Sequence, residues 1–261
     1  MTQTGRSISV EVNAKVNIGL QIVEKRPDGY HNLQTIFYPT DFFHDLMTVR
    51  RVAGDFTLNV DSTEDIGDVE SNLCTKAFRL LQKDFGISGV EISLRKGIPS
   101  GAGLGGGSAD AAATLRLLDD LFCLSIPMNR MQEYALQLGS DVPFFILNEP
   151  VYATGRGEIM TPVSLDLSAY KLKIVKPEIS ISTREAYGGV TPKLPSISLV
   201  EAVKRPVEKW KNLIVNDFEE RLFEKYPLLA ETKQKLYDEG AVYASMSGSG
   251  SACFGLFNAA S

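Results

Sequence analysis

Apolar and polar residues alternate along four segments of the first hundred residues. Each segment is also rich in β-branched residues, and a period of two with such residues is typical of β-strands that bury one face. We therefore expect strands there, and we expect them to form an antiparallel first third of the chain. The four segments are residues 7–25, 46–51, 55–60 and 89–95.

After residue 70 the spacing of the apolar residues changes to that of helices. Apolar residues recur at helical spacing from 73 to 81, which predicts a helix with Ser71 as its N-cap. The alanine-rich run 109–122 predicts a second helix behind a cap at Ser108, and a third helix is expected to end at Gly139. The apolar residues just beyond that glycine resemble a strand.

The order of strands and then helices begins again in the second part of the chain. Residues 170–177 have the pattern of a strand, two or three short helices are expected after it, and 241–246 and 251–257 are expected to be strands. Strands followed by helices, twice over, favour an α+β architecture. We therefore expect two domains, residues 1–160 and 161–261.

Five of the seven residues from Gly101 to Gly107, which we call the glycine segment, are glycines. Ordering them costs backbone entropy that a bound ligand would offset. Gly101 and Gly106 have the spacing of a Walker phosphate loop, but residue 107 is not the lysine that this loop requires. A G-x-G-x-x-G dinucleotide fingerprint also fits, but the strand that should follow its helix is missing. We favour an anion nest, in which consecutive amides and a helix N-terminus bind phosphate, over a loop that only lets two backbones approach.

The composition is that of a soluble globular chain with an acidic balance. There are 27 Lys and Arg against 32 Asp and Glu, which gives a net charge of −5 and a pI near 5.2. We expect no nucleic-acid partner, since such proteins are usually basic or carry a basic stripe. No apolar run approaches a membrane span and the first residues lack the order of a signal peptide, so we expect a cytoplasmic protein without a membrane partner. The three cysteines are expected to be core thiols, and two histidines exclude a histidine-rich metal site.

Two polar residues interrupt apolar stretches in a way that suits phosphoryl transfer. Lys15 lies inside the strand pattern of residues 7–25, and Asp141 follows the helix that is expected to end at Gly139. Phosphoryl transfer needs a cation to neutralise developing charge and a carboxylate to accept the proton of the acceptor hydroxyl. A lysine on the wet face of a strand and an aspartate in a turn remain the alternatives.

Three motifs, in this order, resemble those of the GHMP small-molecule kinases. They are NAKVNIGL at 13–20, PSGAGLGGGSADAA at 99–112 and MSGSGSACFGLF at 246–257. Within that superfamily, EKRPDGYHNLQTIF at 24–37 and LGSDVPFF at 138–145 resemble the branch whose substrate is a cytidyl diphosphate-linked methylerythritol of the non-mevalonate isoprenoid pathway. Asn13 departs from the first motif, which has a proline at that position in the family.

The resemblance implies a fold, a reaction and a catalytic pair. The fold is an N-terminal domain of the ribosomal protein S5 domain 2-like type joined to a C-terminal α/β sandwich, with the active site in the cleft between them. The reaction transfers a phosphoryl group from ATP to the 2-hydroxyl of the methylerythritol moiety, with Mg²⁺ expected but no metal site in the protein. Asp141 is then the general base, Lys15 orients that carboxylate and stabilises negative charge, and Asn17 positions the substrate.

The resemblance also assigns the residues that bind the two substrates. Tyr30, His31 and Tyr187 are expected at the cytosine ring, with Thr183 at the ribose. Each stack of a base on an aromatic ring contributes about 1 to 3 kcal/mol. A plain surface turn at residues 27–29 is the alternative for the first two residues, and a helix start is the alternative for Asn72. The residues expected to bind ATP are Asn72, Lys96, Pro99, Gly101, Ala102, Gly103, Leu104, Gly105, Gly106, Gly107 and Ser108.

Two other functions stay open on the sequence. Another GHMP kinase, acting on homoserine, mevalonate or a sugar such as galactose, would share the glycine segment but would have no use for the residues at 28–31 together with Tyr187. A nucleotide-binding regulatory protein would lose the base or the lysine, and both Asp141 and Lys15 are present.

Overall fold

The computed structural model describes residues 5–63 and 68–259. Contacts within the chain divide this part into two compact units, each of which combines helices with strands, so the expected α+β class is confirmed. The division of the chain at residue 160 stays a prediction. Unit 1 contains residues 5–14, 43–63, 68–100 and 105–148, and unit 2 contains residues 15–42, 101–104 and 149–259.

The two longest strands, β1 (Ser7–Lys25) and β2 (His31–Arg51), pair with each other, and each contributes residues to both units. The strand predicted over 7–25 is confirmed. From Ala14 to Ile22 every residue of β1 is buried, although the sequence alternates between apolar and polar side chains. Polar side chains on this stretch are therefore buried as well, and they need hydrogen-bond partners inside the protein.

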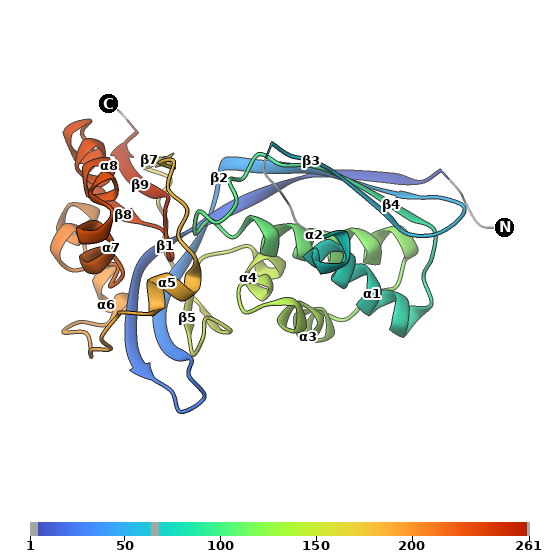
Figure 1. The fold of residues 1–261 in the computed structure, drawn as a ribbon, viewed down its shortest axis with the longest axis horizontal. Helices are drawn as coiled ribbons and strands as arrows, with labels where there is room; N and C mark the ends of the chain where they lie inside the picture. The colour runs from blue at the N-terminus through green and yellow to red at the C-terminus, as the bar shows by residue number, and fades with distance from the viewer. Residues whose placement is uncertain (1–4, 64–67, 260–261) are drawn as a thin grey trace. The chain divides into compact units, whose positions relative to one another are not determined.

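In unit 1, β2 pairs with β4 (Val90–Arg95), which pairs with β3 (Thr57–Asp61). β2 and β4 are antiparallel, but β3 and β4 are parallel, so the expectation of a wholly antiparallel first third is wrong. The reason is that α1 (Leu73–Phe85) connects β3 to β4 and returns the chain to the same end of the sheet. In Figure 1 the α-helices of unit 1 lie on one side of these strands. They are α1, α2 (Gly106–Phe122), α3 (Met128–Leu138) and α4 (Val142–Leu147).

In unit 2, the strands expected at 170–177, 241–246 and 251–257 are confirmed. They form an antiparallel sheet in the order β7–β9–β8, and α8 packs against β8 and β9 (Figure 1). β5 and β6 form a hairpin that pairs with β2. The elements of unit 2 are β5 (Val151–Thr154), β6 (Ile159–Pro162), β7 (Tyr170–Val175), α5 (Thr183–Tyr187), α6 (Leu199–Ala202), the 3₁₀ helix Val207–Asn212, α7 (Glu219–Lys225), α8 (Pro227–Asp238), β8 (Tyr243–Met246) and β9 (Cys253–Asn258).

Two helices begin at residues other than those expected. Ser71 ends a 3₁₀ turn, and the N-cap of α1 is Asn72, whose Oδ1 accepts a hydrogen bond from the Cys74 amide over 2.9 Å. α2 begins at Gly106 behind Gly105, so Ser108 lies inside the first turn and is not the cap. The glycines thus enter the helix, because nothing in their backbone prevents helical dihedral angles.

The segment that resembles a strand after Gly139 is the short helix α4, so that interpretation is wrong. A short apolar run has no periodicity that separates a strand from a buried helix, and five of the six residues of α4 are buried. Pro143 fits the first turn of a helix, where its missing amide has no partner to lose. The end of the preceding helix at Gly139 is confirmed.

Two of the three cysteines are core thiols, as expected. Cys74 and Cys253 are buried, and burial raises the pKa of each thiol to about 12. Cys123 is exposed, which corrects the expectation for this residue, because it follows α2 in a left-handed conformation with φ of +55°. No helix in the described ranges combines the length and the apolar composition needed to span a bilayer.

Candidate active site

Three sequence motifs meet at one backbone carbonyl in unit 2, that of Gly103. The Lys15 ammonium donates a hydrogen bond to this oxygen over 3.0 Å, and the Ser247 hydroxyl donates another over 2.9 Å. The backbone amide of Lys15 donates to the next carbonyl, that of Leu104, over 3.0 Å. These bonds join β1, the glycine segment and the loop between β8 and β9.

Lys15 is only 3% exposed, so its charge depends on close partners. Its ammonium also bonds to Oδ1 of Asn17 and lies 4.9 Å from the centre of the Phe37 ring. Asn17 is held in turn, because its backbone amide donates to Ser247 Oγ over 3.1 Å and its Nδ2 donates to Thr35 Oγ1 over 2.9 Å. Lys15 and Asn17 therefore share one face of β1, as their spacing of two predicts.

The glycine segment is hydrogen-bonded to the described residues through its carbonyl groups rather than through its amides. Gly101, Gly103 and Gly105 have φ of +61°, +75° and +77°, a region that only glycine occupies readily. The carbonyls of residues 102–105 all accept hydrogen bonds. None of the described residues accepts a hydrogen bond from the amides of residues 103–107. The amides of Gly106 and Gly107 belong to the first turn of α2, where an α-helix offers no acceptor. Such a run of amides can bind an anion.

His31 and Tyr187 come together in unit 2, although 155 positions separate them in the chain. Their ring centres lie 5.2 Å apart with the planes 31° from parallel, and Tyr187 also packs edge-on against Phe218 at 4.8 Å. Burial, and after it the charge of Lys25, lowers the pKa of His31. The imidazole is therefore neutral at pH 7 and offers one N–H donor and one acceptor nitrogen. Thr183 is exposed in the first turn of the same helix, α5.

Tyr30 lies next to His31 at the end of a turn. The Tyr30 amide donates to Oδ1 of Asp28 over 3.1 Å, and Gly29 has φ of +85°, so the turn expected at residues 27–29 is present. Tyr30 is 57% exposed, and the guanidinium carbon of Arg156 lies 5.1 Å from the centre of its ring. The turn thus presents an aromatic face to solvent.

In unit 1, the ammonium of Lys96 lies between two carboxylates. It bonds to Asp45 and, over 2.6 Å, to Oδ2 of Asp110. Burial opposes the charged ammonium, but these two carboxylates outweigh it, so the pKa of Lys96 is raised. The ammonium also lies beside Gly106, where an added Cβ would be 3.5 Å from Nζ. Lys96 and the start of α2 are therefore neighbours.

The remaining residues with predicted roles also lie in unit 1. Pro99 precedes the glycine segment. Gly105 is the N-cap of α2, and residues 106–108 form the first turn of that helix. Asn72 uses its side-chain oxygen on the first turn of α1. Asp141 is half-buried at the N-cap position of α4 and makes no capping bond to that helix.

Three residues that hold the predicted site residues received no role from the sequence. Ser247 lies in the third motif, and Thr35 and Asp45 lie on β2. Thr35 and Asp45 are fully buried, and Thr35 donates to the Gly19 carbonyl over 2.6 Å. The sequence signal for such residues is a short polar side chain within a strand pattern. The sequence alone does not show that the position is buried.

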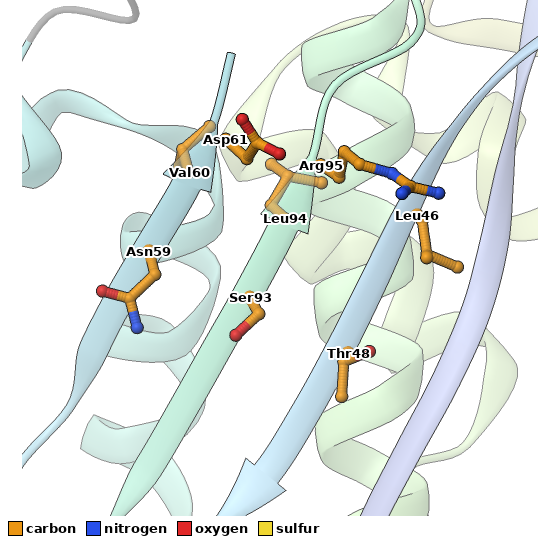
Figure 2. Close-up of a pocket in the computed structure, with 8 residues that line it drawn as sticks. All are labelled: Leu46, Thr48, Asn59, Val60, Asp61, Ser93, Leu94 and Arg95. Atoms are coloured by element: carbon orange, nitrogen blue, oxygen red, sulfur yellow. The ribbon is translucent and has the colours of Figure 1, made fainter.

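The hollow drawn in Figure 2 lies on unit 1, over the neighbouring strands β3, β4 and β2. None of the residues with a predicted role lines it. We therefore assign it no part in the reaction. Its lining residues are Leu46, Thr48, Asn59, Val60, Asp61, Ser93, Leu94 and Arg95.

Replacing Gly103 with alanine is expected to destabilise the protein, because the new Cβ would lie 2.0 Å from the Ser247 carbonyl oxygen and φ is +75°. We expect a loss of about 2 kcal/mol, which corresponds to a fall of about 4 to 8 °C in the unfolding temperature measured by calorimetry.

The matched control is Gly107→Ala. An added Cβ there meets no atom within 4 Å, and alanine favours a helix over glycine by up to about 1 kcal/mol. This variant should unfold at the temperature of the native protein or slightly above it. Equal losses in the two variants would contradict the role assigned to the Gly103 carbonyl.

The chain is similar to known protein families and to known proteins. Residues 72–149 match the family model described as GHMP kinases N terminal domain, and residues 199–261 match the one described as GHMP kinases C terminal. A Bacteroides fragilis protein named 4-diphosphocytidyl-2-C-methyl-D-erythritol kinase is 49% identical over 248 residues, which cover 94% of this chain and 90% of that protein. A crystal structure of 4-(cytidine 5'-diphospho)-2C-methyl-D-erythritol kinase is 35% identical, with a TM-score of 0.79 over 95% of this chain and 90% of the other.

More distant solved structures share the fold alone. The mevalonate kinase of Methanococcus jannaschii is 15% identical, with a TM-score of 0.73 over 97% of this chain and 91% of the other. The resemblance stated from the three motifs is thus confirmed, together with the fold it implies. The chain belongs to the GHMP kinase family.

Proposed function

We propose that the protein is an ATP-dependent kinase that phosphorylates the 2-hydroxyl of 4-diphosphocytidyl-2-C-methyl-D-erythritol in the non-mevalonate isoprenoid pathway. The observation that carries the proposal is the contact of Lys15 and Ser247 with the Gly103 carbonyl. Beside it lies a run of amides that have no acceptor among the described residues. The names of the Bacteroides relative and of the 35% identical structure support the same substrate.

ATP is proposed to bind with its phosphates on the glycine segment. The amides of residues 103–107 and the N-terminal end of α2 favour a negative ligand. Ser108 lies in the first turn of α2 and would add its hydroxyl to the phosphate contacts. Pro99 and residues 101–102 are also proposed to contact ATP. Lys96 is proposed to approach the nucleotide beside Gly106, and Asn72 to contact the adenine.

In the proposed reaction the acceptor oxygen forms a bond to the γ-phosphorus while the bond from that phosphorus to the β–γ bridging oxygen breaks, so that ADP leaves. Asp141 takes the proton of the acceptor hydroxyl. Lys15 orients that carboxylate and stabilises the developing negative charge. Asn17 positions the substrate, and its bonds to Thr35 and Ser247 support this role by fixing its side chain and backbone.

The cytidyl group is proposed to bind at Tyr30, His31 and Tyr187, with its ribose near Thr183. The contact between the rings of His31 and Tyr187 and the exposed face of Tyr30 support this assignment. A neutral imidazole can donate to and accept from the polar edge of cytosine. The aromatic rings contribute stacking energy that a substrate without a base would not gain.

Mg²⁺ is proposed to accompany ATP, because it neutralises phosphate charge in this class of reaction. No group of three His, Cys, Asp or Glu side chains within residues 5–63 and 68–259 could hold a metal ion. We further propose that the enzyme acts in the cytoplasm on this small molecule and has no nucleic-acid or membrane partner.

The alternative is another GHMP kinase, which would use the same ATP site. An assay of ADP release with the cytidyl-methylerythritol substrate, homoserine, mevalonate and galactose distinguishes the two. We expect release with the first compound alone. Turnover of homoserine, mevalonate or galactose at a higher kcat/KM would overturn the proposed substrate but would leave the kinase assignment in place.

Replacing Asp141 with asparagine should lower kcat by about a hundredfold or more and leave the affinity for ATP nearly unchanged, because the variant lacks only the base. Steady-state kinetics and calorimetric titration with ATP measure the two quantities. The control is Asp120→Asn, an exposed carboxylate in the same unit. A variant at position 141 with native turnover would remove the base assignment.

Replacing Tyr187 with alanine should raise KM for the cytidyl substrate about tenfold, since one stacking contact of about 1.4 kcal/mol is lost. Tyr187→Phe keeps the ring and its packing against Phe218, so it should keep the KM, which separates the contribution of the ring from that of the hydroxyl. The KM for ATP should stay constant in both variants. If both substitutions raise the KM of the cytidyl substrate equally, cytosine stacking on this ring is wrong.

A further inference from the structure

Within unit 1, the carboxylates of Asp45 and Asp110 lie at the two sides of the glycine segment in the sequence. Asp45 Oδ1 accepts hydrogen bonds from the amides of Gly97 and Ile98 over 2.6 and 2.8 Å, just before the segment begins. Asp110 lies in the second turn of α2, just after the segment ends. The ammonium of Lys96 joins the two carboxylates. One cluster thus fixes the chain on either side of the phosphate-binding residues.

The charges of the cluster do not balance. Two carboxylates surround one ammonium, so the cluster carries a net charge of −1 when all three groups are ionised. The Asp110 side chain is 4% exposed and that of Asp45 is fully buried. Oδ1 of Asp110 is buried and accepts no hydrogen bond from the described residues. An ionised carboxylate with an unpaired buried oxygen is costly, and a proton on that oxygen removes the cost.

Among the residues that the structure describes, the groups around Asp110 do not supply a second positive charge. Burial raises the pKa of Asp110 to about 7; attraction to Lys96 works against the rise, and repulsion from Asp45 adds to it. Cys74, on α1, has a thiol pKa raised to about 12 and is neutral in this range. His44 precedes Asp45 on β2 and therefore points to the opposite face, where it lies 3.9 Å from Glu11.

The cluster also adjoins the proposed phosphate site directly. The Lys96 ammonium lies beside Gly106, the first residue of α2, and two of its three N–H donors serve the carboxylates. A net negative cluster at this position would repel a triphosphate, whereas a neutral cluster would not. Binding of the anion therefore favours the protonated state of the cluster, and protonation favours binding to the same extent.

We propose that Asp45, Lys96 and Asp110 are positioning residues for the glycine segment, and that the cluster takes up a proton on Oδ1 of Asp110 when a nucleoside triphosphate binds. The inference rests on the proposed function, since it requires the triphosphate at the glycine segment. It makes ATP binding weaker as the pH rises through neutrality, because free Asp110 has then lost the proton that the complex retains.

The test is calorimetric titration of the full-length protein and of Asp110→Asn with ATP at pH 6.0 and at pH 8.5. Asparagine has the shape of the protonated acid and cannot ionise. If the bound nucleotide raises the pKa of Asp110 by one unit, native affinity falls about tenfold between the two pH values relative to the variant. The variant should bind ATP as well as the native protein at pH 6.0 and about tenfold more tightly at pH 8.5.

A merely structural role for Asp110 predicts the opposite result, since loss of a structural contact weakens binding at both pH values. The phosphate of ATP titrates in the same range but does so equally with both proteins, so the difference between them isolates the cluster. The control Asp120→Asn, an exposed carboxylate on the same helix, should behave as the native protein. If both the native protein and Asp110→Asn bind ATP, but their affinities change equally between the two pH values, the inference is wrong.

A second measurement uses only the native protein, in case Asp110→Asn fails to fold. Titrations at pH 7.5 in two buffers with different ionisation enthalpies give the number of protons exchanged. The proposal requires net uptake of protons on binding, whereas amides that favour the fully ionised phosphate cause release. Net release would overturn it. Absence of ATP binding at every pH would instead contradict the proposed function.

Discussion

The position of the glycine segment depends on the carbonyl of Gly103. Its oxygen accepts hydrogen bonds from the Lys15 ammonium and the Ser247 hydroxyl, so one acceptor joins three motifs that lie far apart in the chain. In a trans peptide the carbonyl of Gly103 and the amide of Leu104 point in opposite directions. Engaging the carbonyl inside the protein therefore leaves the amide for a ligand. Only glycine allows this backbone, because a Cβ would collide with the Ser247 carbonyl.

Lysine ammonium groups stand beside the glycine segment in both units. In unit 2 the Lys15 ammonium bonds to the Gly103 carbonyl and to Asn17 and lies near the Phe37 ring, and in unit 1 the Lys96 ammonium lies between two carboxylates. Burying such groups costs stability that an apolar core would not lose. Their bonds fix side-chain positions, and a fixed arrangement of charge is what phosphoryl transfer requires of a protein. Under the proposed function, the acidic chain would bind its anionic substrate through local dipoles and a few buried cations.

The sequence predicted most strands, the three motifs and the family, because periodicity and motif order are local properties. It failed where the outcome depended on packing. The parallel pairing of β3 and β4, the helical state of the residues after Asp141 and the exposure of Cys123 follow from tertiary contacts. Ser108 and Ser71 were misassigned as caps because the neighbouring glycines and Asn72 could also begin a helix. The cluster around Lys96 joins residues 45, 96 and 110, a combination that no spacing reveals.

In the proposed function, main-chain amides of the glycine segment bind the triphosphate without a Walker lysine. A crystal structure of the protein with a non-hydrolysable ATP analogue tests it most directly. We expect phosphate oxygens within about 3.2 Å of amide nitrogens in residues 103–107. An analogue bound with its phosphates elsewhere, and a glycine segment without ligand in the same crystal, would contradict the account.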